Sequence, residues 1–360
     1  QIAVHRLLRM SDYFGLYTIA LIAFILCCET IFVNSSSINV TTGQWNDDSD
    51  QVLYQRLVEF YAQGVQSSSS IASRFHTPCF NQMKVFNSSN PIIEQQRELV
   101  LRYFQRSQHL RLHEIYKNPS KILPLYKLHI CTISEVASTE LNGLYVRLIE
   151  TPLDYVDNYV PTKRDRDEYQ RPYYKGLFLL RSSPQEIIDI ITDKTWLHIA
   201  FVRNPYTRLL AGYLRYYVSH ESIPRDIVVP GAHKNISFEG FIGCLEKAGT
   251  SHNGVMQLVD IFRGQVFMCG FNGLNYDLIG QYETLERDVR CMAKNRGFES
   301  ALNFGWGEYG NSTVFDKINE ESQNITELLR TYYSKDLQNR VYNLYKLDFE
   351  AFGYPYDLPQ

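Results

Sequence analysis

The stretch HIAFVRNPYTRLLAGY, residues 198–213, decides the fold because it joins a strand to a helix without an intervening loop. Its apolar start continues the run TWLHIAFV, residues 195–202, which is typical of a buried strand. Asn204 is a favoured N-cap residue, and Pro205 is favoured at the first helical position. We therefore expect the strand to end at residue 202 and a helix to follow at once.

Arg203 lies at this junction, where the backbone itself attracts anions. The free N–H groups and the dipole of a helix N-terminus favour negative charge. The guanidinium of Arg203 adds a full charge and a bidentate fork suited to phosphate, and Arg208 lies further along the same helix. The junction predicts an anion site. The alternative is an arginine that caps the sheet edge or pairs with a carboxylate.

Two other stretches repeat the order of strand and helix. Residues 125–133 read as a strand and residues 139–149 have helical spacing. Residues 276–283 form a third candidate strand, and Thr284 is a candidate N-cap for the helix that follows. Strands that alternate with helices predict an α/β fold with a parallel sheet and helices on its faces. Such sheets bind ligands at the carboxyl ends of their strands.

The N-terminal part carries a membrane signal. Residues 13–33 are uncharged except for Glu29, and this length of 21 residues is close to the ~20 that cross a bilayer. Arg6 and Arg9 precede the segment, so the positive-inside rule places the N-terminus in the cytosol. A cleaved signal peptide is the main alternative, because the uninterrupted run ends at Cys28. A buried core helix is the third interpretation.

The segment 34–50 is polar and reads as a linker, whereas residues 92–116 have the pattern of a long amphipathic helix. The expected organisation is a cytosolic tail (1–12), a transmembrane signal-anchor (13–33), a luminal stem with accessory helices (34–120) and a catalytic-like domain (121–360).

Sequons and cysteines fit a luminal placement. Six N-x-S/T sequons occur in the chain, at Asn34, Asn39, Asn87, Asn235, Asn311 and Asn324. Five cysteines lie outside the membrane segment, at positions 79, 131, 244, 269 and 291. Disulfides form in an oxidising lumen, and an odd number leaves at least one cysteine free or paired outside the chain. No Cys/His spacing suggests zinc, so no metal is expected.

The stretch FVRNPYTRLLAGY, residues 201–213, resembles the 3′-phosphate-binding motif of the Golgi carbohydrate sulfotransferases, roughly F-V-R-D-P-F-x-R-L-x-S-A-Y. These enzymes, of the chondroitin-type sulfotransferase family 2, use 3′-phosphoadenosine 5′-phosphosulfate (PAPS) as donor. The resemblance implies that Arg203 contacts the 3′-phosphate. Arg208 matches the motif's second arginine, Asn204 replaces its usual aspartate, and Ala211 stands where the family has a serine, which removes one hydroxyl donor.

CTISEVASTEL, residues 131–141, resembles the family's 5′-phosphosulfate loop, roughly C-x-V-P-K-x-A-C-T-x-W. The resemblance implies that this loop cradles the donor through five residues, namely Glu135, Val136, Ala137, Ser138 and Thr139. The family's proline and lysine are replaced by Ser134 and Glu135. The lysine neutralises charge on the bridging oxygen as the sulfuryl group leaves, so another cation, such as Lys127, is needed.

Three further segments resemble the family in the family's own order. They are SHNGVMQ (251–257), in which His252 matches a family histidine, YDLIGQYETLERDV (276–289) and VYNLYKLDFEAFGYPYD (341–357). The resemblance covers residues 121–357 and implies the sulfotransferase fold, a P-loop-like parallel sheet flanked by helices. No G-x-x-x-x-G-K-[ST] sequence occurs, which argues against an unrelated P-loop kinase.

The implied reaction is transfer of a sulfuryl group from PAPS to a hydroxyl of a glycan or glycosaminoglycan in the Golgi lumen. His252 is the candidate general base, because imidazole titrates near working pH; a structural histidine is the alternative. The chain's net charge of −3 gives no general case for a nucleic-acid partner. A second hypothesis is a catalytically inactive luminal relative that binds nucleotide or glycan, which Glu135 and Ala211 favour.

Overall fold

The computed structural model describes most of the C-terminal two thirds of the chain and one shorter segment before it. The described residues are 68–84, 120–150, 184–219, 228–249, 260–271, 276–306 and 310–359, with the isolated positions 52, 55, 56, 59 and 223. The predicted membrane segment 13–33, the linker 34–50, the helix 92–116 and His252 lie outside them. Among the described helices, none combines the length and apolar character needed to span a bilayer.

A four-stranded sheet forms the centre, with the order β1-β2-β3-β4. The strands are β1 (Ser120–Leu123), β2 (Leu128–Thr132), β3 (Leu197–Val202) and β4 (Leu278–Gln281). The predicted parallel pairing is confirmed, because β3 is parallel to both β2 and β4. Strand β1 was not predicted and runs antiparallel to β2.

The predicted strand 125–133 is too long at its start. Residues Pro124–Tyr126 form the 3-10 turn η2, and Lys127 has a left-handed backbone with φ 47°. This turn reverses the chain between β1 and β2, so an antiparallel edge strand precedes the parallel set. The four-residue β1 is too short to show a pattern of its own.

The central strands are buried along their whole length, as parallel strands covered on both faces usually are. Every residue of β2 and β3 is buried. Gly280 of β4 pairs in register with Phe201 of β3. A Cβ at position 280 would lie 2.3 Å from the Phe201 ring, so only glycine lets these two strands pair at this point.

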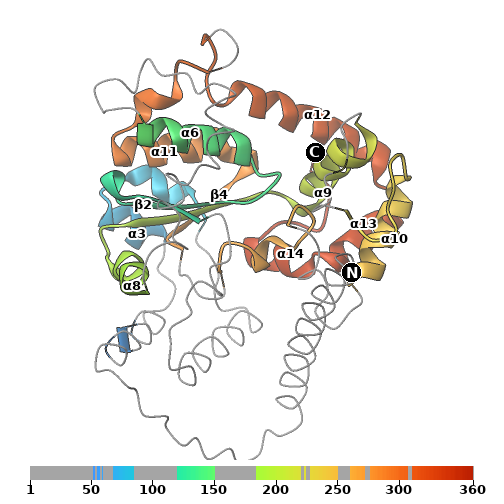
Figure 1. Ribbon diagram of the computed structural model, residues 1–360, viewed down its shortest axis with the longest axis horizontal. Coiled ribbons are helices and arrows are strands. Elements are labelled where there is room, and N and C mark those ends of the chain that lie inside the picture. The colour runs from blue at the N-terminus through green and yellow to red at the C-terminus, as the bar shows by residue number, and fades with distance from the viewer. Residues whose placement is uncertain are drawn as a thin grey trace, which may run out of the picture. The chain divides into compact units, whose positions relative to one another are not determined.

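Helices cover both faces of the sheet. In Figure 1, α6 (Ser138–Glu150) and α11 (Leu285–Arg296) lie on one side of the sheet and α8 (Pro184–Thr192) on the other. Two short turns, η10 (Tyr282–Thr284) and η11 (Glu299–Leu302), flank α11. Thr284 occupies the predicted N-cap position, but its hydroxyl donates to the carboxylate of Asp288 instead of capping a backbone N–H.

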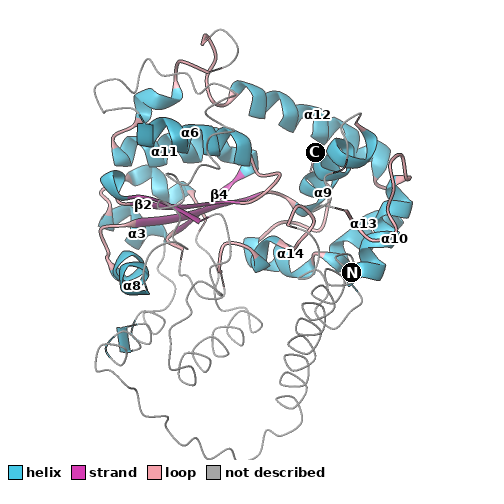
Figure 2. Ribbon diagram, in the orientation of Figure 1, coloured by secondary structure: helices cyan, strands magenta, loops and turns pink. Residues whose placement is uncertain are grey.

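A second core of helices begins where β3 ends. Helix α9 (Pro205–Tyr213) continues into a π-helical turn, η6 (Leu214–Val218). Around α9 lie α10 (Phe238–Gly249), α12 (Asp316–Tyr332), α13 (Lys335–Leu344) and α14 (Lys346–Phe352), as Figure 2 shows. This core is rich in aromatic rings that pack against one another, for example Tyr217 and Phe241, which are tilted by 45° with centroids 4.6 Å apart.

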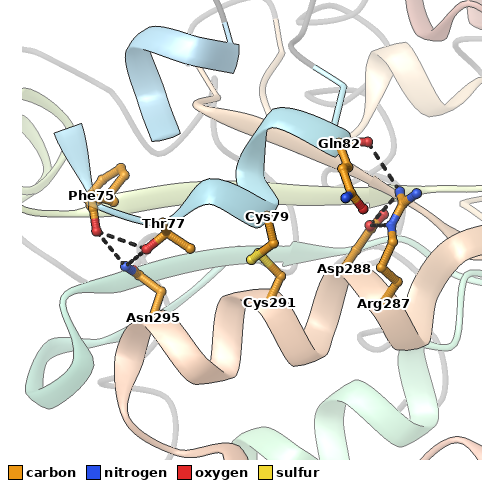
Figure 3. The surroundings of a disulfide bond; sticks show 8 residues. All are labelled: Phe75, Thr77, Cys79, Gln82, Arg287, Asp288, Cys291 and Asn295. Carbon is orange, nitrogen blue, oxygen red and sulfur yellow. Dashed lines mark hydrogen bonds and ion pairs between the residues drawn. A yellow bond between two sulfur atoms is a disulfide. The ribbon is translucent and has the colours of Figure 1, made fainter. Parts of the chain in front are cut away.

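A disulfide fastens an early segment to the sheet domain. Cys79 in η1 (Pro78–Gln82), which follows α3 (Ser68–Arg74), is bonded to Cys291 of α11 (Figure 3). Beside it, the Asn295 side chain donates to the Thr77 hydroxyl at 2.6 Å. Cys131 and Cys269 form a second disulfide and Cys244 is free, as the odd count predicted. Residues 68–84, assigned from the sequence to the stem region, thus pack into the main core.

Candidate functional site

The turn after β3 forms as the sequence predicts. Asn204 is the N-cap of α9, and its side chain accepts a hydrogen bond from the Tyr206 N–H at 2.9 Å. Pro205 holds the first helical position. The Asn204 N–H donates to the Glu283 carboxylate at 2.8 Å, and the Tyr354 hydroxyl donates to the other oxygen of that carboxylate. The start of α9 is therefore fixed from within the fold.

The Arg203 guanidinium is buried, with its side chain only 1% exposed. Its Nη1 donates to the Glu135 carbonyl at 3.0 Å and to the Glu321 carboxylate at 3.1 Å, and its Nε donates to the Thr207 hydroxyl at 3.2 Å. The Tyr282 ring lies beneath it, 3.9 Å from the guanidinium carbon. Its buried Nη2 has no hydrogen-bond partner among the described residues. A buried donor without a partner is costly, so this group is suited to an incoming anion.

The loop between β2 and α6 bends sharply around residues 133–138. Glu135 and Ala137 both have left-handed backbones, with φ 64° and 52°. A left-handed residue next to an ordinary one can turn neighbouring backbone N–H groups toward one point, and such turns form anion-binding concavities. At the start of α6, Ser138 is half-buried and Thr139 is exposed, whereas Val136 and Ala137 are buried. Backbone amides and two hydroxyls are thus the groups that this loop offers.

Glu135 does not leave the loop negatively charged. Its side chain is 5% exposed and accepts a hydrogen bond from Arg215 Nη1 at 3.2 Å. The expectation that Lys127 replaces the family's lysine is wrong, because Lys127 precedes β2 and therefore lies at the opposite end of the sheet. There it pairs with Asp193 at 3.4 Å and lies over the Trp196 ring.

Arg208 holds the site together through backbone carbonyls. Its Nε donates to the Ser134 carbonyl at 3.1 Å, its Nη1 to Arg263 O at 2.7 Å and its Nη2 to Asp260 O at 3.0 Å. The side chain is buried, and this burial lowers the pKa of Arg208 below its usual value. All three nitrogens of its fork thus bond to the protein, so Arg208 braces the loop.

A segment around η9 (Gln265–Phe267) clamps both turns. The Gln265 side chain accepts from Arg203 N–H at 2.9 Å and donates to Arg203 O at 2.7 Å. Asp348 of α14 accepts in turn from the N–H groups of Gln265 and Val266. Burial raises the pKa of Asp348, although these N–H groups oppose the rise. The Cys131–Cys269 disulfide ties the same segment to the end of β2.

The two turns predicted to share one site lie in contact. Arg203, after β3, reaches a carbonyl of the loop after β2, and Arg208 reaches the neighbouring carbonyl. Thr207 and Ala211 follow Arg203 at four-residue intervals and lie on the same face of α9. Among the described residues, no group of three or more His, Cys, Asp or Glu side chains is placed to hold a metal ion.

The Sulfotransferase family model matches residues 118–355, which is more than half of the chain. The chain belongs to this sulfotransferase family. It is 27% identical to carbohydrate sulfotransferase 11 of Danio rerio over 177 residues, which cover 45% of this chain and 47% of the relative. It is 26% identical to carbohydrate sulfotransferase 12 of Mus musculus over 250 residues, 62% of this chain and 57% of that protein. The chain spans about half the length of these curated relatives, and no solved structure matches it.

Side chains of both charges surround Arg203 in this member of the family. Glu135, Glu140 and Glu321 bring three carboxylates to the same region as Arg203 and Arg215. Burial raises the pKa of Glu140, and the charge of Glu321 raises it further. The side chain of Glu321 is 51% exposed. Because the Glu321 end of the Arg203–Glu321 ion pair is solvated, the Glu321 carboxylate can move away from Arg203 at a modest cost in free energy.

Some residues of the site lie far from their partners along the chain and were not predicted from the sequence. Arg215 follows the motif of residues 201–213 by two positions, but its partner lies 80 residues earlier in the chain. Glu321 lies on α12 with no motif around it. Tyr282 and Asp348, by contrast, lie within segments that resemble the family, so the signal for them was present in the sequence.

Proposed function

We propose that this chain is a PAPS-dependent carbohydrate sulfotransferase that modifies a hydroxyl of a glycan or glycosaminoglycan. The observation that carries the proposal is the buried Arg203 guanidinium, with one donor unused, beside a turn of left-handed residues. Both features suit phosphate groups. The names of the relatives supply the carbohydrate acceptor.

The residues present fit PAPS as a substrate. Arg203 is proposed to bind the 3′-phosphate, with Asn204 and Ala211 lining the same turn. The amides of residues 135 and 137–139 and the hydroxyls of Ser138 and Thr139 are proposed to bind the 5′-phosphosulfate; the Val136 N–H already donates to the Ile133 carbonyl. Positioning and charge stabilisation account for most of the catalysis in group transfer of this kind.

The reaction is an in-line displacement at sulfur. The acceptor hydroxyl oxygen forms a bond to sulfur as the bond from sulfur to the bridging phosphate oxygen breaks. The proton of the hydroxyl passes to a general base, for which His252 remains the candidate, and the electron pair of the broken bond stays on 3′-phosphoadenosine 5′-phosphate (PAP). Cations near the 5′ end offset the charge that develops on the leaving oxygen.

A Golgi location with a single-pass type II anchor at residues 13–33 remains part of the proposal. The two disulfides support a compartment of the secretory pathway, because cytosolic proteins rarely keep disulfides. Of the six sequons, Asn235, Asn311 and Asn324 are described and all three are exposed, as glycan attachment requires.

A second candidate is an inactive relative that binds nucleotide or glycan. The observation that favours it is the Glu321 carboxylate, which occupies Arg203 at 3.1 Å, together with Glu135 in the loop. The two candidates differ in turnover, because only the enzyme transfers sulfate.

Transfer of labelled sulfate from PAPS to a panel of desulfated glycosaminoglycans and glycoproteins tests the enzyme. We expect transfer to at least one acceptor and its loss in Arg203→Ala. Calorimetry with PAP should show that Arg203→Ala binds at least tenfold more weakly, about 1.4 kcal/mol. Equal binding of PAP by both forms would remove Arg203 from the site. Nucleotide binding without transfer to any acceptor would favour the inactive relative.

A further inference from the structure

The loop after β2 carries a glutamate where the family carries a lysine, yet a cation stands beside it. The Glu135 carboxylate is almost fully buried and accepts a hydrogen bond from Arg215 Nη1 at 3.2 Å. The side chain of Arg215 is 48% exposed. The carboxylate therefore lies on the protein side of the pair and the guanidinium lies toward solvent.

Two arginines donate hydrogen bonds to different groups of Glu135. Arg203 Nη1 donates to the main-chain carbonyl of Glu135 at 3.0 Å, whereas Arg215 donates to its carboxylate. The two guanidinium groups thus converge on one residue of the turn that is proposed to hold the donor's 5′ end. Arg203 was expected from the sequence, whereas Arg215 comes from the structure alone.

Arg215 is held by an unusual piece of helix. It lies in η6, the π-helical continuation of α9, which the Ser219 N–H closes by donating to the Leu214 carbonyl at 2.8 Å. Turns of this kind are rare in proteins as a whole, but those that occur are frequently found at functional sites. A guanidinium has five N–H donors, and Glu135 accepts from one of them. The half-exposed fork therefore keeps donors for an anion that arrives from solvent.

We propose that Arg215, positioned by Glu135, binds the 5′-phosphate end of the donor nucleotide in place of the missing loop lysine. This inference rests on the proposed function and adds a residue to the same site. The Glu135–Arg215 pair carries no net charge, so it contributes to phosphate binding through directed hydrogen bonds and not through net positive charge. The fork offers hydrogen bonds to the phosphate oxygens, and the carboxylate behind it keeps the fork in place.

Two nucleotides separate this role from a structural one. PAP carries both the 3′- and 5′-phosphates, and adenosine 3′-phosphate lacks the 5′-phosphate. Calorimetry on the full chain in detergent should show that Arg215→Ala binds PAP at least tenfold more weakly. Its affinity for adenosine 3′-phosphate should stay within twofold of the parent. Arg203→Ala should weaken both ligands. Arg340→Ala, which removes another arginine paired with a glutamate, should weaken neither.

A rescue experiment returns the cation to the loop. Glu135→Lys in the Arg215→Ala background should restore PAP affinity to within threefold of the parent, whereas Glu135→Gln in that background should not. Thermal midpoints check that each variant is folded. Equal losses for both nucleotides in Arg215→Ala, or no loss for PAP, would overturn the assignment of Arg215 while the proposed function stands. A parent chain that binds neither nucleotide would overturn the proposed function and this inference together.

Discussion

The two ends of the same sheet use charged and polar groups in opposite ways. At the amino end, His129 of β2 and His198 of β3 are register partners, with their Nδ1 atoms 3.1 Å apart and both rings buried. Beside them, Asp277 forms an ion pair with Arg74, and both residues are largely covered. At the carboxyl end, by contrast, the side chains of Arg215 and Glu321 are half-exposed and can be reached from solvent.

This difference shows which polar groups serve the fold and which are available to a ligand. A polar group that is buried and paired inside the core serves the fold and cannot meet a substrate. A charged group that is bonded on one side and solvated on the other can exchange its partner for an anion. Parallel sheets place such groups at the carboxyl ends of their strands.

Arg208 gives the largest expected effect. It lies at the carboxyl end of the sheet, but its guanidinium bonds to backbone carbonyls, as that of a structural residue does. Arg208→Met leaves three partly buried carbonyls without this donor, and an unsatisfied buried group costs about 1–3 kcal/mol. We expect a loss of about 3 kcal/mol or more in the free energy of unfolding, measured by urea denaturation. Arg290→Met, which removes a partly exposed pair with Glu286, should lose less than about 1 kcal/mol. A similar small loss in Arg208→Met would mean that Arg208 is not a brace.

The histidine pair tests the amino end. Burial lowers the pKa of His198 to about 3 and that of His129 well below its usual range. The folded chain therefore binds fewer protons than the unfolded chain below pH ~6.5, so stability falls as the pH drops. The double variant His129→Leu, His198→Leu should lose less stability than the parent between pH ~6.5 and ~5, by about 3 kcal/mol. Parallel pH profiles would contradict this. His129→Phe alone, with about half the effect, serves if the double variant does not fold.

Glu321 tests whether the ion pair at the carboxyl end competes with a ligand. Glu321→Gln removes the charge that occupies Arg203, so PAP should bind about three- to tenfold more tightly, roughly 1 kcal/mol. Glu320→Gln makes the same change in net charge one residue away on α12 and should change affinity much less. If the two variants behaved alike, the effect would be general electrostatics and not displacement of one carboxylate.

The smallest effect is expected at Ala211, on the face of α9 that carries Thr207. Ala211→Ser restores the hydroxyl that the family motif has at this position, and one added hydrogen bond should tighten PAP binding by about threefold, roughly 0.6 kcal/mol. Ala248→Ser on α10 is the matched control. Weaker binding by Ala211→Ser would show that the 3′-phosphate does not approach this face.

Local chemistry accounts for the parts of the fold that the sequence predicts. The apolar run 195–202, the cap at Asn204 and the proline after it are fixed by neighbours in the chain, so the turn at Arg203 forms as expected. The antiparallel strand β1 was not predicted, because the chain reversal before β2 depends on a left-handed backbone at Lys127. No glycine stands at this position to indicate such a backbone in the sequence.

The partners of the site residues depend on tertiary packing and could not be read from local sequence. Arg215 meets Glu135 across 80 residues, and Glu321 meets Arg203 across 118. The same distance in sequence explains the wrong expectation for Lys127, which is closer to the loop along the chain but lies at the other end of β2. Closeness in the sequence suggested Lys127 as the replacement cation, but the direction of β2 places Lys127 at the end of the sheet opposite to the loop.

Hydrogen exchange with and without PAP tests the central claim most directly, namely that the carboxyl end of the sheet binds the donor nucleotide. We predict slower exchange at the amides of residues 133–141 and 203–208 when PAP is present, with no change around His129 and His198. Protection confined to the amino end of the sheet, or none at either end, would contradict the account.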